Sequence, residues 1–176
     1  MNDLVRLCLA LGAHKAANIR PTQLRFSTEF LDACRQNLCG RYGKNHTCPP
    51  HVGDITQLIA RVKAYQNAVI FQTVHQLEDS FDLEGMQHGQ DLHNQITFDA
   101  AQQAKAQHHN LLALNAGGCF LCKNCAAITH EPCRFPGQAI SSLEAHGIDV
   151  SSIEHISDMK YINGPNTVTY FSGLFY

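Results

Sequence analysis

Hydrophobic residues recur at helical spacing in several parts of the chain. At the start, Leu4, Leu7, Cys8 and Leu11 follow the i, i+3, i+4, i+7 pattern, which predicts an amphipathic helix over residues 3–15. The same periodicity and helix-capping residues predict further helices at 28–37, 54–65 and 90–108, from 136 to 147, and from 151 onward.

Runs of β-branched, aromatic and other apolar residues separate these helices. They predict strands or extended segments at 19–26, 68–74, 111–116 and 167–176. The polar and acidic stretch 76–91 is expected to be a surface loop. This order of elements predicts an α/β or α+β fold, with a single mixed four-stranded sheet flanked by helices and two cysteine-rich metal loops. With 176 residues and no convincing linker, the chain is expected to form a single metal-binding domain over residues 1–176.

Composition and charge exclude several classes of function. Apolar residues make up 44% of the chain, which is too large a share for a disordered protein. The net charge is −2 and no run of Lys or Arg occurs, so neither nucleic acid nor an anionic membrane surface is indicated as a partner. No apolar stretch approaches the roughly 18 residues of a membrane span, and Asp3 and Arg6 argue against a secretory signal. We therefore expect a cytoplasmic protein.

The chain has eight cysteines, and seven of them form two clusters. Each cluster lies in a segment rich in Gly and Pro: the first contains Cys34, Cys39 and Cys48, and the second contains Cys119, Cys122, Cys125 and Cys133. In a chain without an export signal, such crowding indicates metal or redox chemistry rather than a disulfide framework.

The second cluster has the spacing of an iron–sulfur site. Two residues separate Cys119 from Cys122 and Cys122 from Cys125, so three thiols share one tight loop. Bacterial ferredoxins use this spacing with a more distant Cys-Pro ligand, and here Cys133 is the candidate fourth thiolate for a [4Fe–4S] cluster. Gly117 would let the backbone approach the sulfurs closely. Structural zinc sites usually place a longer segment between two C-x2-C pairs, so zinc is the weaker alternative.

The first cluster defines its ligand set less completely. Its C-x4-C step and the Cys48-Pro pair supply only three thiolates, so a metal or second cluster needs a further ligand. The alternatives are a water, a substrate, a cysteine exchanged with the other cluster, and the side chains of Cys8, His46 and His51. Exchange would place Cys48 and Cys133 in each other's site, as in two-cluster ferredoxins. A half-used zinc site or a buried thiol cluster is the remaining interpretation.

Other residues that invite a chemical role have structural interpretations. Cys8 lies on the apolar stripe of the first predicted helix and is expected to be a core residue, because free cysteine is among the most buried residue types. Arg134 and Glu144 are expected to pair and to fix the second cysteine loop against the helix that follows. Four histidines have no ligand spacing and are expected to have no metal role: His88, His93, His108 and His109.

The motifs around both clusters resemble those of a family of unknown function found in bacteria and archaea, described as predicted metal-binding proteins. The matching segments appear in the family's order: Cys34 and Cys39, YGK (42–44), CPP (48–50), GGCFLCKNC (117–125), CRFP (133–136) and SLEAHGIDV (142–150). The resemblance implies that the seven clustered cysteines are metal ligands, and it implies no reaction. It also implies a cysteine or a small residue in many relatives where this chain has His146.

Three functions agree with these patterns. The first, which we favour, is one-electron transfer to a redox partner protein by one [4Fe–4S] cluster, or by two. The second is an enzyme that uses an incompletely ligated iron at the three-cysteine site on a small ligand, in a pocket lined by Tyr42, Lys44 or His51. The third is a structural zinc module that binds another protein.

Overall fold

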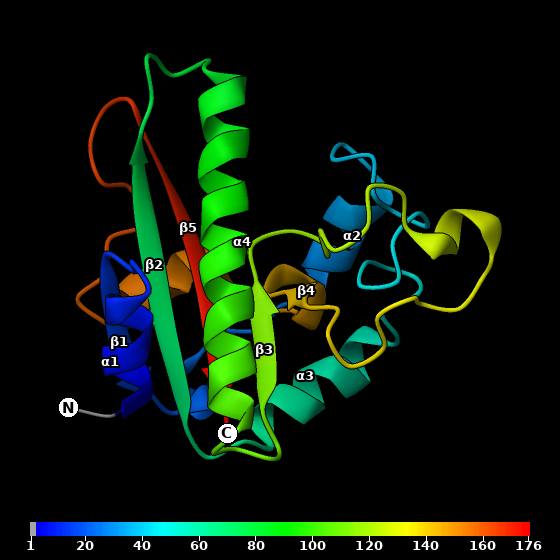
Figure 1. The fold of residues 1–176 in the computed structure, drawn as a ribbon, viewed down its shortest axis with the longest axis horizontal. Coiled ribbons are helices and arrows are strands. Elements are labelled where there is room, and N and C mark those ends of the chain that lie inside the picture. The colour runs from blue at the N-terminus through cyan, green and yellow to red at the C-terminus, as the bar shows by residue number, and fades with distance from the viewer. Residues whose placement is uncertain (1–2) are drawn as a thin grey trace.

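The computed structural model describes residues 3–176, and in this part of the chain one open, mixed sheet lies between helices (Figure 1). Its five strands are β1 (Lys15–Ile19), β2 (Ala68–Gln76), β3 (Leu112–Asn115), β4 (Ser141–Ser142) and β5 (Thr167–Phe175). Their order in the sheet is β1-β2-β5-β3-β4, and all neighbours are antiparallel except β3 and β4, which are parallel. The predicted α/β class with one mixed sheet is confirmed.

Some helices in the described part of the chain begin just after a residue whose side chain caps the helix. They are the α-helices α1 (Asp3–Ala10), α2 (Glu29–Arg35), α3 (Ile55–Lys63) and α4 (Leu83–Lys105), and the short 3-10 helices η1 (Pro21–Gln23), η2 (Ala126–Thr129), η3 (Glu144–His146) and η4 (Val150–His155). Asp54 caps α3 by accepting a hydrogen bond from the Gln57 backbone at 3.1 Å, as its sequence predicts. None of these helices is long and apolar enough to cross a membrane.

The sheet is buried on both faces because its strands alternate between two cores. In β2, Val69 and Phe71 point to the face covered by α1 and α4, whereas Ala68 and Ile70 point to the opposite face. That opposite core is completed by residues of α3 and of the 3-10 helices, of which Ile153 in η4 is fully buried. A strand that alternates between two apolar faces reads as a continuous apolar run, which is why β2 was visible in the sequence.

Several predicted boundaries are wrong in the first part of the chain. The first helix ends at Ala10 rather than at residue 15, because Gly12 takes a left-handed conformation (φ 110°) and turns the chain. The first strand is β1 over 15–19, not 19–26. It pairs along β2, and this long-range pairing has no local signal in the sequence.

The predicted surface loop 76–91 is largely helical. Asp82 caps α4 by accepting from the Gly85 backbone at 2.8 Å, so the helix begins at Leu83. The loop was predicted because the stretch is polar and acidic, and glycine inside a helix is also unfavourable by about 1 kcal/mol relative to alanine. Gly89 is needed for packing, because a Cβ there would lie 2.8 Å from the ring of His75 on β2.

The predicted helix over 136–147 is absent. The chain instead forms β4, which pairs with the end of β3, and the single 3-10 turn η3. The predicted sheet therefore lacked one strand, because two serines carry no strand pattern. Arg134 and Glu144 do not pair, since Arg134 donates to the carbonyl of Asn124 at 2.9 Å.

Both cysteine clusters lie in long connections on one side of the molecule. One connection runs from α2, whose last turn carries Cys34, to α3, and the other runs from β3 to β4. The two connections lie side by side beyond the β3–β4 edge of the sheet (Figure 1). The topology therefore brings clusters that are far apart in sequence to one region.

Candidate metal centre

The segment 45–48 joins the two cysteine loops. The backbone N–H of Cys119 donates to Thr47 Oγ1 at 2.9 Å, and Asn45 Nδ2 donates to the Cys119 carbonyl at 3.0 Å. Ser141 of β4 donates its hydroxyl hydrogen to the Thr47 carbonyl at 2.7 Å. Asn45 and Thr47 are both buried, so these bonds are shielded from water. They fix the two loops to each other and to the edge of the sheet.

The four cysteines of the second cluster line one small cavity, which we call the four-thiol cavity: Cys119, Cys122, Cys125 and Cys133. Its volume is about 20 Å³, which leaves room for little more than one water molecule. The backbone N–H of His46 points at this group and donates to Cys125 Sγ at 3.5 Å. Cys133 therefore lies with the three closely spaced cysteines, where a fourth ligand is expected.

The first cluster lines a larger cavity, the three-thiol cavity, with Cys34, Cys39 and Cys48 in its wall. Its volume is about 520 Å³, within the range of about 300–1,000 Å³ that small-molecule sites occupy. The other polar side chains in its wall are Arg41, Tyr42, Gln87, Gln90, Ser142 and Glu144. This cavity therefore contains more space and more polar groups than three thiols alone require.

The two thiol-lined cavities adjoin each other at Gly118. A Cβ on Gly118 would lie 2.9 Å from Cys48 Sγ, closer than real Cβ atoms approach a neighbour. The missing side chain thus lets the Cys48 sulfur lie against the loop that carries Cys119. Cys48 lines the three-thiol cavity and Cys133 lines the four-thiol cavity, so each lies with its own cluster.

Three of the seven clustered thiols have a raised pKa, which favours their protonated form. Burial raises the pKa of Cys34 and Cys119, and burial together with the neighbouring Cys39 raises the pKa of Cys48 to about 11. A thiol with a raised pKa is a poor nucleophile, because the reactive form is the thiolate. A bound metal removes the proton instead. The electrostatics therefore suit metal ligands better than a reactive cysteine.

The clustered thiols line two cavities and do not converge on the position of a single ion. Among residues 3–176, no three His, Cys, Asp or Glu side chains meet around a single ion position. In a cluster of several metal atoms, each atom takes its own thiolate, so the ligands stand apart from one another. The four-thiol cavity fits that arrangement in its donor atoms, since it supplies one thiolate for each of four metal atoms.

The remaining candidate ligands are distributed unevenly. His46 lines the four-thiol cavity, whereas His51 and Lys44 line neither thiol cavity. Of the residues predicted around an open iron, only Tyr42 lines the three-thiol cavity. Cys8 of α1 is fully buried in the core, and burial raises its pKa to about 12.

His93 is a core residue, as its sequence context indicates. Its Nδ1 lies 2.9 Å from Thr73 Oγ1 and its Nε2 lies 2.7 Å from Ser172 Oγ, so both ring nitrogens have partners inside the protein. Its side chain has no exposed surface.

Sequence reasoning missed four polar residues of the three-thiol cavity, which are Gln87, Gln90, Ser142 and Glu144. Gln87 and Gln90 lie on the part of α4 that was predicted to be a loop, and Glu144 was assigned to an ion pair that does not form. Burial raises the pKa of the Glu144 carboxyl. The one sequence signal for Glu144 was its place in the motif SLEAHGIDV (142–150), where it follows the apolar Leu143.

Fold and site together define a cysteine-rich α/β protein with two adjoining thiol-lined cavities. The chain belongs to the DUF2284 family of predicted metal-binding proteins, whose sequence pattern it matches over residues 17–176. This confirms the resemblance that the cysteine motifs indicate. Comparisons with curated proteins and with solved structures gave no match.

Proposed function

We propose that this chain is an iron–sulfur protein in which Cys119, Cys122, Cys125 and Cys133 bind one [4Fe–4S] cluster. The four-thiol cavity carries this proposal, because it gathers four thiols around one small enclosed space. The C-x2-C-x2-C spacing of the first three cysteines supports it, since this spacing is typical of cubane clusters.

The function proposed for this cluster is one-electron transfer. When bound, a [4Fe–4S] cluster supplies reversible one-electron oxidation and reduction. The protein's own residues control its surroundings: the loop half-buries the four thiols, and the His46 N–H donates to Cys125 Sγ. Hydrogen bonds to cluster sulfurs and limited solvent access both alter the reduction potential.

Electron transfer requires a partner protein that approaches the cluster loop. Two apolar side chains on this loop face solvent: Ile128 is 50% exposed and Phe135 is 40% exposed. Exposed apolar groups of this kind are common at protein–protein contacts. We propose that a redox partner protein docks on this outer surface, and that both work in the cytoplasm, where clustered thiols stay reduced.

A structural zinc ion in the four-thiol cavity is the alternative. Tetrahedral zinc requires its sulfurs at about 2.3 Å from one point. The C-x2-C-x2-C spacing lacks the longer segment that separates the C-x2-C pairs of structural zinc sites, and this supports a cluster over a single ion.

A second candidate function belongs to the three-thiol cavity. Three thiols leave a bound metal or cluster one ligand short, and the cavity has the volume to admit a small polar molecule beside it. Arg41 offers hydrogen-bond donors to such a ligand, and the half-buried carboxyl of Glu144, whose pKa is raised by desolvation, lies in the same wall as a group that can exchange a proton with it. We propose binding of a small ligand here, which is the step that the enzyme hypothesis requires.

The cluster assignment is tested by replacing one ligand. We expect Cys122→Ser to lose one cubane, about four iron and four sulfide per chain, because one corner of the cluster loses its thiolate. The matched control is Cys8→Ala, which removes a buried cysteine outside both cavities and leaves the iron content unchanged. Normal iron and sulfide in Cys122→Ser would contradict the assignment.

The open site is tested by adding cyanide, a small anion that binds to iron. We expect cyanide to change the visible and electron paramagnetic resonance spectra of the anaerobic protein. Cys39→Ser, which removes an exposed ligand of the three-thiol cavity, should abolish this change and keep the signal of the four-thiol cluster. A spectrum that cyanide does not alter would show that the protein itself supplies every ligand.

A further inference from the structure

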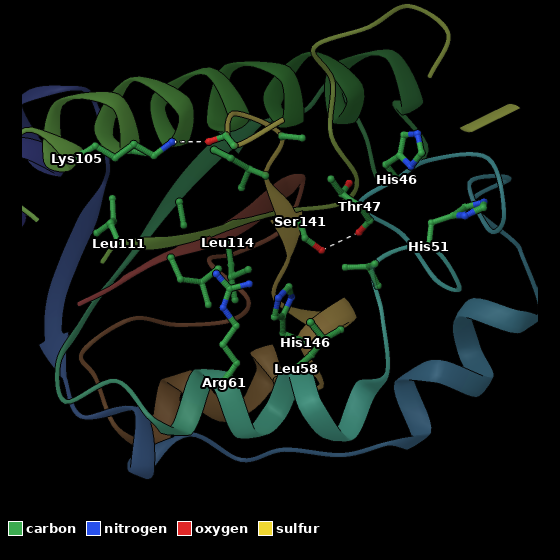
Figure 2. A pocket seen from close by; sticks show the side chains of 17 residues that line it. His46, Thr47, His51, Leu58, Arg61, Lys105, Leu111, Leu114, Ser141 and His146 are labelled. Atoms are coloured by element: carbon green, nitrogen blue, oxygen red, sulfur yellow. Dashed lines mark hydrogen bonds between the residues drawn. The ribbon is translucent and has the colours of Figure 1, made fainter. Parts of the chain in front are cut away.

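A third cavity lies apart from the seven clustered cysteines, and its chemistry is different. It has a volume of about 310 Å³ and lies between α3, the C-terminal half of α4, and strands β3 and β4 (Figure 2). No cysteine and no acidic residue is among the described residues that line it. We call it the basic cavity.

Two cationic side chains enter the basic cavity from different helices. Arg61 projects from α3 on one side, and Lys105 in the last turn of α4 lies on another (Figure 2). Lys105 Nζ donates to the Gly137 carbonyl at 2.7 Å, which fixes its position and leaves two N–H donors free for a ligand. In the described part of the chain, the ion pairs involve neither of these cations. Their charge is therefore not balanced by a carboxylate.

His146 adds a hydrogen-bond acceptor to the same cavity. Its Nδ1–H donates to the Ser142 carbonyl at 3.1 Å, so in the neutral ring Nε2 carries the lone pair. The ring stands at the cavity wall beside Leu58 and Ser141 (Figure 2). Burial, with a contribution from the charge of Arg61, lowers its pKa to about 4, so the ring is neutral at physiological pH.

The rest of the cavity wall combines apolar and polar side chains. Leu58, Leu111, Leu114 and Ile140 supply its apolar part, and further polar side chains come from His46, His51, Thr47 and Ser141. A bare inorganic ion would leave this apolar surface in contact with water, whereas the carbon skeleton of an organic molecule would cover it. The cavity volume suits a molecule of that size.

We propose that the basic cavity binds a small organic anion whose carboxylate or phosphate is held by Arg61 and Lys105, and which donates a hydrogen bond from a hydroxyl or amino group to His146. Guanidinium and ammonium groups form charge-assisted bonds with both kinds of anion. This site does not depend on which metal the cysteines bind.

The basic cavity also shares a wall with the four-thiol cavity. His46 and Thr47 line both cavities, and the same segment supplies the N–H that donates to Cys125 Sγ. A ligand in the basic cavity therefore lies one layer of side chains away from the proposed cluster. Its binding is expected to shift the visible spectrum of the cluster.

The experiment is a calorimetric titration of the anaerobically purified protein with malate and, separately, with glycerol 3-phosphate. Succinate, which lacks the hydroxyl of malate, measures the contribution of His146. We expect one of the two hydroxylated anions to bind, succinate to bind more weakly than malate if the anion is a carboxylate, and Arg61→Met to weaken binding at least tenfold. His146→Gln should remove the difference between malate and succinate.

Lys63→Met is the matched control, because it removes a positive charge from the same helix outside the cavity. Arg61 and Lys63 are both exposed, so neither replacement disturbs the core, and thermal unfolding of each variant verifies this. The proposal is overturned if neither hydroxylated anion binds at about 10 mM. Equal loss of affinity in Arg61→Met and Lys63→Met would also overturn it, since binding would then reflect net charge rather than this cavity.

Discussion

At the residue scale, the buried His93 of α4 makes the stability of the fold depend on pH. His93 lies between Thr73 of β2 and Ser172 of β5, and Thr97 donates to the His93 carbonyl at 2.9 Å. His75 extends the network by lying 2.9 Å from the Thr73 hydroxyl. Burial lowers the pKa of His93 to about 3. The folded protein thus keeps this ring neutral under conditions in which the unfolded chain protonates it.

Acidification should therefore lower the free energy of unfolding. Below the ordinary pKa of 6.5, the unfolded state binds a proton that the folded state does not bind until about pH 3. Stability is lost as the pH falls through this window, by about 1.4 kcal/mol per pH unit for this one group. We expect His93→Gln, which keeps hydrogen-bonding atoms for Thr73 and Ser172, to reduce the slope by that amount.

Urea unfolding at several pH values between 6.5 and about 5 measures these slopes. His109→Gln is the control, because His109 is exposed on the surface. If the wild-type and His93→Gln stabilities fell in parallel, the histidine would not be the source of the acid sensitivity.

At the scale of elements, the segment 45–48 connects the cysteine loops to the sheet. Thr47 Oγ1 accepts from the Cys119 N–H and donates to Asn45 Oδ1 at 2.9 Å, while the Thr47 carbonyl accepts from Ser141. Two of these three bonds, those with Cys119 and Asn45, are made by the buried Thr47 hydroxyl. The position of the second cysteine loop therefore depends on this side chain.

Replacing Thr47 by valine should loosen the cysteine loops. The change keeps the shape and removes the hydroxyl, so the Cys119 N–H loses its acceptor, at a cost of about 1–3 kcal/mol, while Asn45 Oδ1 still accepts from the Thr47 backbone N–H at 3.0 Å. We expect a lower free energy of unfolding and faster release of iron to a chelator. Thr129→Val is the matched control, because Thr129 bonds only locally, to the Ala126 carbonyl. Equal rates of iron release in Thr47→Val and the wild type would contradict the role given to Thr47.

How much of these elements the sequence predicts depends on the range of the interactions involved. The grouping of Cys119, Cys122 and Cys125 was predictable, because their spacing is local. β4 was not, since Ser141 and Ser142 become a strand only by pairing with β3. The start of α4 was obscured because residues 76–91 are polar and acidic, and because Gly89 serves packing against His75 of β2 rather than helix formation.

The site was predictable to a similar extent. The sequence named the thiols of both cavities, but it did not place Gln90 or Glu144 beside the first cluster. Gln90 lies on α4 and Glu144 on η3, and both elements are far from the first cluster in the sequence. Only the folded topology brings them together.

At the scale of the whole molecule, three cavities of different chemistry adjoin on the β3–β4 side of the sheet. Cys48 lines the three-thiol cavity, while His46 and Thr47 line both the four-thiol cavity and the basic cavity. One short segment of chain therefore contacts all three. In the proposed account, an electron-transfer centre lies between an open ligand site and an anion site.

The central claim is that the four-thiol cavity binds a [4Fe–4S] cluster, and the most direct test is the composition of the protein itself. Iron, zinc and acid-labile sulfide per chain should be measured on protein purified without oxygen, together with its visible spectrum. The account predicts about four iron and four sulfide per chain, or about eight of each if the three-thiol cavity also holds a cubane, with a broad absorption that reduction bleaches. A colourless protein that contains zinc and no sulfide would contradict it.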